Sequence, residues 1–219
     1  MIEAGTFDFL KNLAENNNRD WFIEHKPAYG QARENVIDFT KQIIQPLSKI
    51  DPMVNIDIDP KKCVMRIYRD IRFSKDKTPY KTNFGINLKT GGGNAELGYY
   101  LHIQPGSSFA GGGYWMPQAD HLKAIRQEID YNGAALNAIV NDASFIGDFS
   151  AFDGQEQLKN NPKGYEADHP YINLLKLKSF AAMHQFSDKE LMEKSAVQNV
   201  VKYLSKIHPL NNFLNQALH

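Results

Sequence analysis

The chain has only one cysteine, Cys63, among its 219 residues. A lone cysteine excludes an intrachain disulfide framework, and it excludes zinc and iron–sulfur sites that need several thiolates. The lack of disulfides suits a reducing compartment, so the sequence predicts a cytoplasmic protein.

Long apolar runs and a surplus of one charge are also missing. No window approaches eighteen consecutive apolar residues, and the N-terminus has no basic stretch followed by an apolar one, so we expect no membrane association and no export. The 25 basic residues equal the 25 acidic ones, which argues against the wrapping of extended nucleic acid. Any electrostatic attraction must therefore be local.

Motifs for common cofactors and nucleophiles are absent from the sequence. The seven histidines are scattered without an HxH or HExxH pair, so no metal site is predicted. The sequence has two glycine triplets, at residues 91–93 and 111–113. Neither fits a P-loop or a Gly-x-Gly-x-x-Gly turn, which disfavours ATP binding by those routes. No Gly-x-Ser-x-Gly elbow supports a serine nucleophile. The sequence leaves the cofactor and the reaction type open.

Positive charge is concentrated in residues 66–82, RIYRDIRFSKDKTPYKT. This stretch holds six basic residues and two acids, a net charge of +4 in seventeen residues. Arginine offers paired donors that match carboxylate or phosphate oxygens, and the hydroxyl and ammonium groups of the following loop also suit phosphate. The stretch therefore predicts an anion-binding site. The alternatives are a solvated basic loop, or a segment in which Asp70 and Asp76 form ion pairs that hold the arginines in place.

Helical spacing of apolar residues predicts a helical first quarter of the chain. We expect one helix at residues 7–14, a break at NNNRD, and a short second helix that carries Trp21 and Phe22. A third helix is predicted from Pro27, with Pro46 kinking or interrupting it near its end.

Alternation of apolar and polar residues predicts a run of strands in the middle of the chain. In the second of these strands, Cys63, Met65 and Ile67 would share the buried face, and Arg66, Tyr68 and Asp70 the polar one. Glycines at residues 90–94 allow a hairpin turn. The predicted strands are residues 54–58, 63–70, 84–88, 99–103 and 109–115.

Gly111, Gly112 and Gly113 lie within the last of these strands, where glycine lowers stability. Close approach of a ligand or of another backbone would explain three residues without side chains. A bulge or bend that lets Trp115 pack would explain them equally well.

The last third of the chain returns to helical patterns. Two helices are predicted around residues 122–140 with a break near Asn132, and one more strand is predicted in LKLKSFAAMHQF. Ser187 with Glu190 has the spacing of a capping box, and Pro209 is expected to divide the last two helices. The fold class is therefore α+β, with a mainly antiparallel central sheet and N- and C-terminal helices packed on one face.

If the strands form one sheet, its second face is unusually polar. Asp70 and His102 are the candidates for proton transfer on that face. An ordinary solvent-exposed face is the alternative, although lysine, glutamate and threonine would be more usual there than arginine and tyrosine. The candidate ligand-binding residues are Arg66, Tyr68, Arg69, Arg72, Ser74, Lys75, Lys77, Tyr80, Lys81 and Tyr100.

Six blocks of the sequence together resemble a widespread uncharacterised family of bacterial and fungal proteins, a domain-of-unknown-function family of about this length. They are NNRDWF (17–22), RIYRDIRFSKDKTPYKT (66–82), GYYLHIQPG (98–106), GGGYWMP (111–117), LKNNPKGY (158–165) and LKLKSF (175–180). The resemblance covers nearly the whole chain and implies a single domain, residues 1–219, but no activity or cofactor. Its blocks add Trp21 and Lys159 to the residues of interest, and they add Arg19 and Lys163 to the candidate ligand-binding residues.

Two functions agree with these residues. The first is an enzyme or ligand-binding protein that holds a small phosphorylated, carboxylated or nucleotide-like anion in a basic pocket on the polar face of the sheet. The second is a non-catalytic module that binds a nucleic-acid end or an acidic protein partner, because Tyr68, Phe73 and Tyr80 alternate with the basic residues as stacking residues do on single strands. The balanced net charge favours the first.

Overall fold

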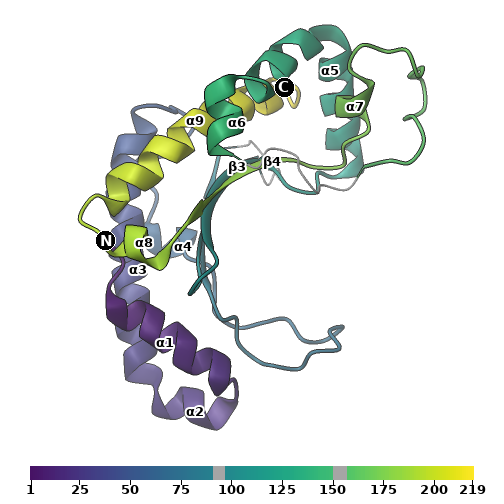
Figure 1. Cartoon of the computed structure of the whole chain (residues 1–219). Coiled ribbons are helices and arrows are strands. Elements are labelled where there is room, and N and C mark those ends of the chain that lie inside the picture. Colours follow the sequence, from purple (N-terminus) through teal and green to yellow (C-terminus); the bar gives the residue numbers. More distant parts are fainter. Residues whose placement is uncertain (91–96, 150–156) are drawn as a thin grey trace. The chain divides into compact units, whose positions relative to one another are not determined.

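The computed structural model describes residues 1–90, 97–149 and 157–219 (Figure 1). Helices come first in the chain, then consecutive strands, then mainly helices, which is the order of an α+β fold and confirms the predicted class. None of the helices in these ranges is long and apolar enough to cross a bilayer. The elements are α1 (Ala4–Glu15), α2 (Arg19–Glu24), α3 (Lys26–Ser48), α4 (Pro60–Cys63), β1 (Phe84–Lys89), β2 (Leu97–Ile103), β3 (Ser108–Tyr114), α5 (Ala119–Val140), α6 (Ala143–Asp148), α7 (Ile172–Leu175), β4 (Phe180–Phe186), α8 (Asp188–Met192) and α9 (Ala196–Gln216).

The four strands form one antiparallel sheet in the order β1-β2-β3-β4. The predicted alternation in β1 and β2 is confirmed, because every second residue is buried. Residues 91–94 of the predicted glycine-rich turn lie outside the described residues. The buried alternate residues are Phe84, Ile86, Leu88, Tyr99, Leu101 and Ile103.

The glycines of β3 are explained by the close approach of a neighbouring strand. A Cβ atom at Gly111 would lie 2.8 Å from the carbonyl oxygen of Ala182 in β4, which is shorter than contacts that real Cβ atoms make. Trp115 is 59% exposed, so a bend that buries this ring is not what the structure shows.

The chain divides into two compact units, of which the first consists of Met1–Leu88, Tyr100–Ala110 and Gln185–Lys202. Within this unit α1 packs on α3, because each helix carries an apolar stripe at helical spacing. The buried residues of these two helices include Phe7, Leu10, Leu13, Val36, Phe39, Ile43 and Leu47.

Side-chain caps at the starts of α2 and α8 in the first unit agree with the sequence. The Asn18 side chain accepts a hydrogen bond from the Trp21 N–H at 3.0 Å, which starts α2 at the predicted break. Ser187 and Glu190 form the predicted capping box at α8, with reciprocal side-chain and backbone hydrogen bonds.

The second unit consists of Lys89–Tyr99, Gly111–His184 and Tyr203–His219. Its α5 is kinked at Asn132, which has non-helical backbone angles (φ −125°, ψ 25°), so two helical segments meet where the sequence predicted a break. The strand predicted from LKLKSFAAMHQF is confirmed as β4. A single-domain organisation stays a prediction.

The strand predicted at residues 54–58 is wrong, because this segment consists of turns. The Asn55 Oδ1 atom accepts a hydrogen bond from the Asp57 N–H at 2.9 Å, and Ile56 is 55% exposed. Side-chain oxygens of asparagine and aspartate satisfy nearby backbone donors and so compete with strand pairing.

The strand predicted at residues 63–70 is also wrong. Cys63 is the last residue of α4, which Asp59 caps, and Met65 is exposed instead of buried. Ile67 keeps its predicted burial, with the residues on both sides of it exposed. Val64 is joined to β1 by an isolated bridge and not by a continuous ladder.

Pro209 does not divide two helices as predicted, and Pro46 does not interrupt α3. α3 continues past Pro46 to Ser48, and α9 continues past Pro209 to Gln216. A proline inside a helix costs about 3 kcal/mol, whereas each fully buried leucine or isoleucine contributes about 1.5–3 kcal/mol. The apolar face of α9 therefore outweighs the lost hydrogen bond. Its buried residues near Pro209 are Leu204, Ile207, Leu210 and Leu214.

Candidate ligand-binding site

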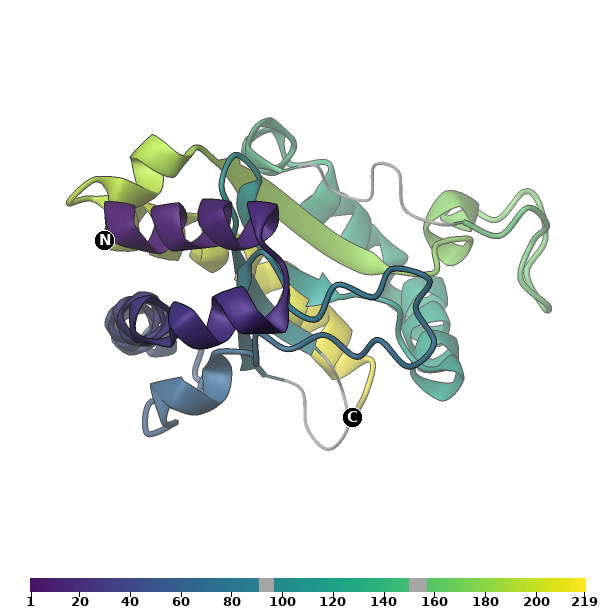
Figure 2. The same cartoon turned by 90° about the horizontal axis from the view of Figure 1, so that it is seen from below.

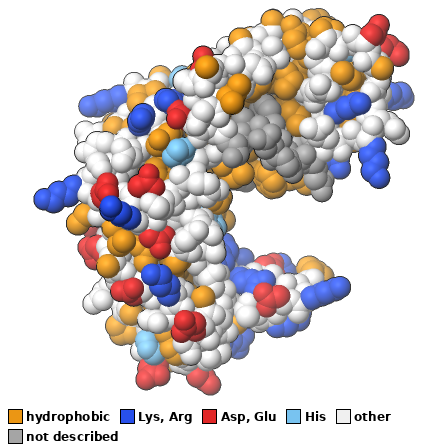
Figure 3. Space-filling view, in the orientation of Figure 1, with side chains coloured by type: hydrophobic (Ala, Val, Ile, Leu, Met, Phe, Trp, Pro, Cys, Tyr) orange, Lys and Arg blue, Asp and Glu red, His pale blue; other side chains and the backbone are white. Residues whose placement is uncertain are grey.

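Residues 66–82 form a two-sided extension of the first unit, which we call the arm. Its sides pair through an antiparallel bridge between Tyr68 and Tyr80, and the Arg69 N–H donates to the Pro79 carbonyl oxygen at 2.9 Å. Figure 1 and Figure 2 show the two sides of the arm running out together, and Figure 3 shows lysine and arginine side chains gathered along them. The concentration of positive charge in the sequence is thus a concentration in space.

Two carboxylates organise the tip of the arm. Asp76 accepts hydrogen bonds from the Thr78 N–H at 2.9 Å and from the Arg69 guanidinium. Asp70 accepts hydrogen bonds from Arg72 Nε at 3.0 Å and from its Nη2 at 2.6 Å. The arm therefore matches the alternative in which the acids hold two of the arginines in place.

These partners lower the pKa of both carboxyl groups. The Thr78 N–H, together with the Arg69 guanidinium, lowers the pKa of Asp76 to about 2, and the Arg72 side chain lowers the pKa of Asp70. A general base works best when its pKa lies near the working pH, so a lowered pKa makes a carboxylate a weak proton acceptor at neutral pH. The proton-transfer role of Asp70 stays a prediction.

Acid should loosen the tip of the arm. Because the pKa of Asp76 is about 2 in the folded arm and 3.8 ordinarily, its ionised form stabilises the arm above pH 3.8, and this contribution is lost as the pH falls from 3.8 through about 2. We expect the NMR signal of the Thr78 amide to titrate with a midpoint near 2, and the Asp76→Asn variant to lack this transition. A Thr78 midpoint near 3.8 would show that the hydrogen bonds to Asp76 do not hold in solution.

A single side chain binds the base of the arm to the connection between α1 and α2. The Asn17 Nδ2 donates to the Tyr80 carbonyl oxygen at 2.9 Å, and its Oδ1 accepts from the Tyr80 N–H at 3.1 Å. The Phe22 ring stacks on the Tyr80 ring at a centroid distance of 4.0 Å, and the Tyr68 ring lies 5.4 Å from the Tyr80 ring. The blocks NNRDWF and RIYRDIRFSKDKTPYKT thus meet, although Asn17 and Tyr80 are 63 residues apart.

A pocket of about 390 Å³ opens beside these rings. Three cationic residues line it: Arg19 at the start of α2, Lys26 at the start of α3, and Arg69 on the arm. None of the lining residues that the structure describes is acidic. The volume lies within the range of small-molecule sites. The aromatic and apolar lining residues are Phe22, Ile23, Tyr68, Ile71, Pro79 and Tyr80.

The charges in this pocket are only partly compensated. In the described part of the chain, neither Arg19 nor Lys26 forms an ion pair with a carboxylate, whereas Arg69 is bound by Asp76. Burial raises the pKa of Tyr80, with Tyr68 adding to this and Arg19 opposing it, so the phenol stays protonated at neutral pH. Partly apolar walls lower the local dielectric, which strengthens electrostatic interactions inside the pocket.

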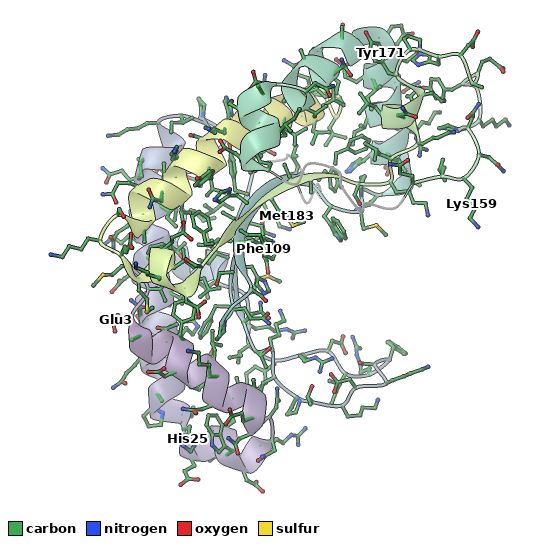
Figure 4. All side chains as sticks on the ribbon, viewed as in Figure 1. Glu3, His25, Phe109, Lys159, Tyr171 and Met183 are labelled. Carbon is green, nitrogen blue, oxygen red and sulfur yellow. The ribbon has the colours of Figure 1, made fainter. Side chains whose placement is uncertain are left out.

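His102 lies in a separate hydrogen-bonded row on the sheet. Its Nδ1 lies 3.3 Å from Asn83 Nδ2 and 3.1 Å from Tyr100 Oη, and its Nε2 lies 2.9 Å from Gln104 Oε1. Both nitrogens of the imidazole are thus engaged by neighbouring polar side chains. The Phe109 ring, labelled in Figure 4, stacks on the imidazole at 4.9 Å.

A model of one protein family, described as a conserved hypothetical protein (DUF2461), matches residues 5–213. The chain belongs to the DUF2461 family. The match spans nearly the whole chain, which confirms the resemblance noted in the sequence. No curated protein and no solved structure matches this DUF2461 chain.

In this DUF2461 protein the sequence-predicted site residues fall into separate groups. The pocket brings together Arg19, Tyr68, Arg69 and Tyr80. Tyr100 and His102 are on β2, and none of the described lining residues of the pocket belongs to the sheet. This pocket is therefore lined by α2, α3 and the arm. A basic pocket on the polar face of the sheet stays a prediction. Elsewhere on the arm are Arg66, Asp70, Arg72, Ser74, Lys75, Lys77 and Lys81, and Lys163 is in the second unit.

Sequence reasoning missed Asn17, Ile23 and Lys26. Asn17 is the first residue of the block NNRDWF, and this position could have pointed to it. Lys26 has no such signal, because a single lysine before a helix-starting proline is typical of an ordinary exposed turn.

Proposed function

We propose that this DUF2461 protein binds a small organic anion that carries a flat ring, such as a phosphorylated, carboxylated or nucleotide-like metabolite. The observation that supports the proposal is the first-unit pocket, where Arg19 and Lys26 lack a carboxylate partner among the described residues and lie beside the stacked rings of Phe22 and Tyr80. The cations would bind the acid group, and the exposed Tyr68 ring, which also lines the pocket, would hold the flat part of the ligand.

The lining residues suit different parts of such a ligand. Arg19 can present two parallel donors to two oxygens of one acid group, which a lysine cannot. Tyr68 is 52% exposed whereas Tyr80 is 5% exposed, so Tyr68 is the tyrosine ring that is open to a ligand. The hydrogen bond to Asp76 fixes the Arg69 guanidinium before any ligand binds, which lowers the entropy lost on binding.

The proposal concerns binding and assigns no chemical step. Neither Asp70 nor His102 is among the described residues that line the pocket. The Asp70 carboxylate is engaged by Arg72, and the His102 imidazole is engaged on both nitrogens.

Isothermal titration with AMP, adenosine and inorganic phosphate tests the proposal. AMP should bind more tightly than either of its parts, because it alone supplies both an anion and a flat ring. Arg19→Ala should weaken AMP binding about tenfold or more, since hydrogen bonds to charged groups contribute about 1.5–3 kcal/mol.

Arg72→Ala is the matched control, because it removes the same charge from an exposed residue that does not line the pocket. It should leave the affinity for AMP unchanged. Equal losses in the Arg19 and Arg72 variants would reveal unspecific charge attraction, and this result or the absence of AMP binding would overturn the proposal.

One observation favours a second function, the binding of a nucleic-acid end by the arm. Phe73 is 95% exposed near the tip, and the Arg72 guanidinium carbon lies 5.9 Å from the centre of its ring. Exposed rings between cations stack on unpaired bases. Binding of a short single-stranded oligonucleotide that Phe73→Ser abolishes and Arg19→Ala preserves would support this function over the first.

A further inference from the structure

A second pocket, of about 490 Å³, lies within the second unit. One wall is a single face of α5, because its lining residues there follow helical spacing, and the other wall is residues 162–165. No residue of the blocks LKNNPKGY (158–165) and LKLKSF (175–180) is among the described lining residues of the first-unit pocket, although both blocks carry the family resemblance. Four charged residues line the second pocket: Lys123, Arg126, Asp130 and Lys163.

The two blocks are paired with each other in the structure. The Leu158 N–H donates to the Lys176 carbonyl oxygen at 2.8 Å, and Gln157 forms an antiparallel bridge with Leu177. This pairing holds the segment that contains residues 162–165 against the segment that precedes β4. Backbone contacts with residues 176–177 thus hold this segment shortly before it reaches the pocket wall.

Arg126 belongs to the α5 wall of the pocket, and backbone carbonyl groups hold its side chain in place. Its Nε donates to the Leu175 carbonyl oxygen at 2.8 Å, and its Nη2 donates to the Leu177 carbonyl oxygen at 3.3 Å. Carbonyl oxygens satisfy hydrogen bonds without cancelling the charge, and Nη1 keeps its two N–H groups for another acceptor. In the described part of the chain, no carboxylate forms an ion pair with Arg126.

A tight turn presents Lys163 and Tyr165 to the pocket. The Tyr165 N–H donates to the Pro162 carbonyl oxygen at 3.2 Å, and Gly164 has a φ of +93°. A positive φ at the third position is that of a type II turn, where glycine is the favoured residue. The sequence Pro-Lys-Gly-Tyr therefore fixes the backbone from which the lysine projects.

The balance of charge in this pocket is positive. Three cations line it against one carboxylate, and the Asp130 carboxylate is itself engaged by His169 Nε2 at 3.0 Å. Burial raises the pKa of Tyr165, so its phenol is protonated at neutral pH and can donate a hydrogen bond.

We infer that this pocket is a second anion site, which binds the phosphate group of a small phosphate monoester through Lys123, Arg126 and Lys163. Tyr131 and Tyr165 also line the pocket and can contact the remainder of such a ligand. The inference does not depend on the first-unit pocket, because the two pockets share no residue.

An NMR titration of the full chain with inorganic phosphate and then pyrophosphate tests this site. The amides of Gly164 and Tyr165 and the Arg126 Nε–H should shift in a saturable way. Lys163→Gln should weaken the binding that these signals report about tenfold, the loss expected for one charge-assisted hydrogen bond.

Lys159→Gln is the matched control, because Lys159 is an exposed lysine of the same block that does not line the pocket (Figure 4). It should leave the affinity unchanged, as should Arg19→Ala in the first unit. Equal weakening by the Lys159 and Lys163 variants would show unspecific attraction, and loss of the shifts in the Arg19 variant would place the anion in the first unit. Either result, or unmoved amides at residues 162–165, would overturn the inference.

Discussion

Gly113→Ala is expected to lower the free energy of unfolding by more than about 4 kcal/mol, the size of effect seen when a substitution clashes with packed backbone. A Cβ atom at this position would overlap the carbonyl oxygen of Phe180 and would lie 2.9 Å from the Cα of Ala181. Gly113 also has a φ of +107°, which side chains rarely adopt. Because the obstacle is the backbone of β4, no side-chain rotation can relieve it, and β3 and β4 must separate locally.

Thermal unfolding followed by circular dichroism measures this effect. A loss of 4 kcal/mol corresponds to a fall in Tm of about 8–16 °C for a chain of this size. Gly147→Ala is the control in the same unit, because a Cβ atom there meets nothing within 4 Å and position 147 is helical. It should raise the stability by about 0.5–1 kcal/mol. If Gly113→Ala melts at the wild-type temperature, the close contact of β3 with β4 is wrong.

Ile67→Ala is expected to produce the second large loss, about 2–5 kcal/mol, which is usual for removing a buried isoleucine side chain. Ile67 is only 1% exposed, although it lies in the most strongly charged part of the sequence. Its burial anchors the base of the arm, where the Lys81 N–H donates to the Ile67 carbonyl oxygen at 2.7 Å. Losing this anchor should destabilise the pairing of the two sides of the arm along with the core.

The neighbouring Arg66→Ala should change the stability by no more than about 0.5 kcal/mol, as exposed positions usually do. Arg66 is exposed. Burial is the main cause that lowers the pKa of Lys81, and the positive charge of Arg66 lowers it further, because the two cations repel each other. Urea unfolding of both variants gives the comparison directly. A larger loss for Arg66→Ala than for Ile67→Ala would mean that Arg66 stabilises the fold through an ion pair and that the assignment of buried and exposed positions is wrong.

The fold class could be predicted because its signals are local. In β1 and β2 a period of two residues alone determines which side chains face the core, so the burial of Phe84 and Tyr99 followed from the sequence. The same rule predicted that Tyr100, His102 and Gln104 would share a face, since they alternate along one strand.

Local rules failed where a competing interaction was stronger. Asn55 forms a side-chain turn that ends the pattern of alternation at residues 54–58, and the buried face of α9 carries the helix through Pro209. In both cases the sequence pattern was present, but the energy of another contact decided the structure.

The tip of the arm was determined by the sequence itself, because Asp76 reaches Thr78 two residues away and needs no distant partner. The pockets were decided only by the tertiary structure. The amide of Asn17 meets Tyr80 across 63 residues, and Arg126 meets Leu175 across 49. No local period encodes such contacts, because they depend on how separately folded segments dock. The sequence thus determined which residues carry the charge, and packing decided which of these charges share a pocket.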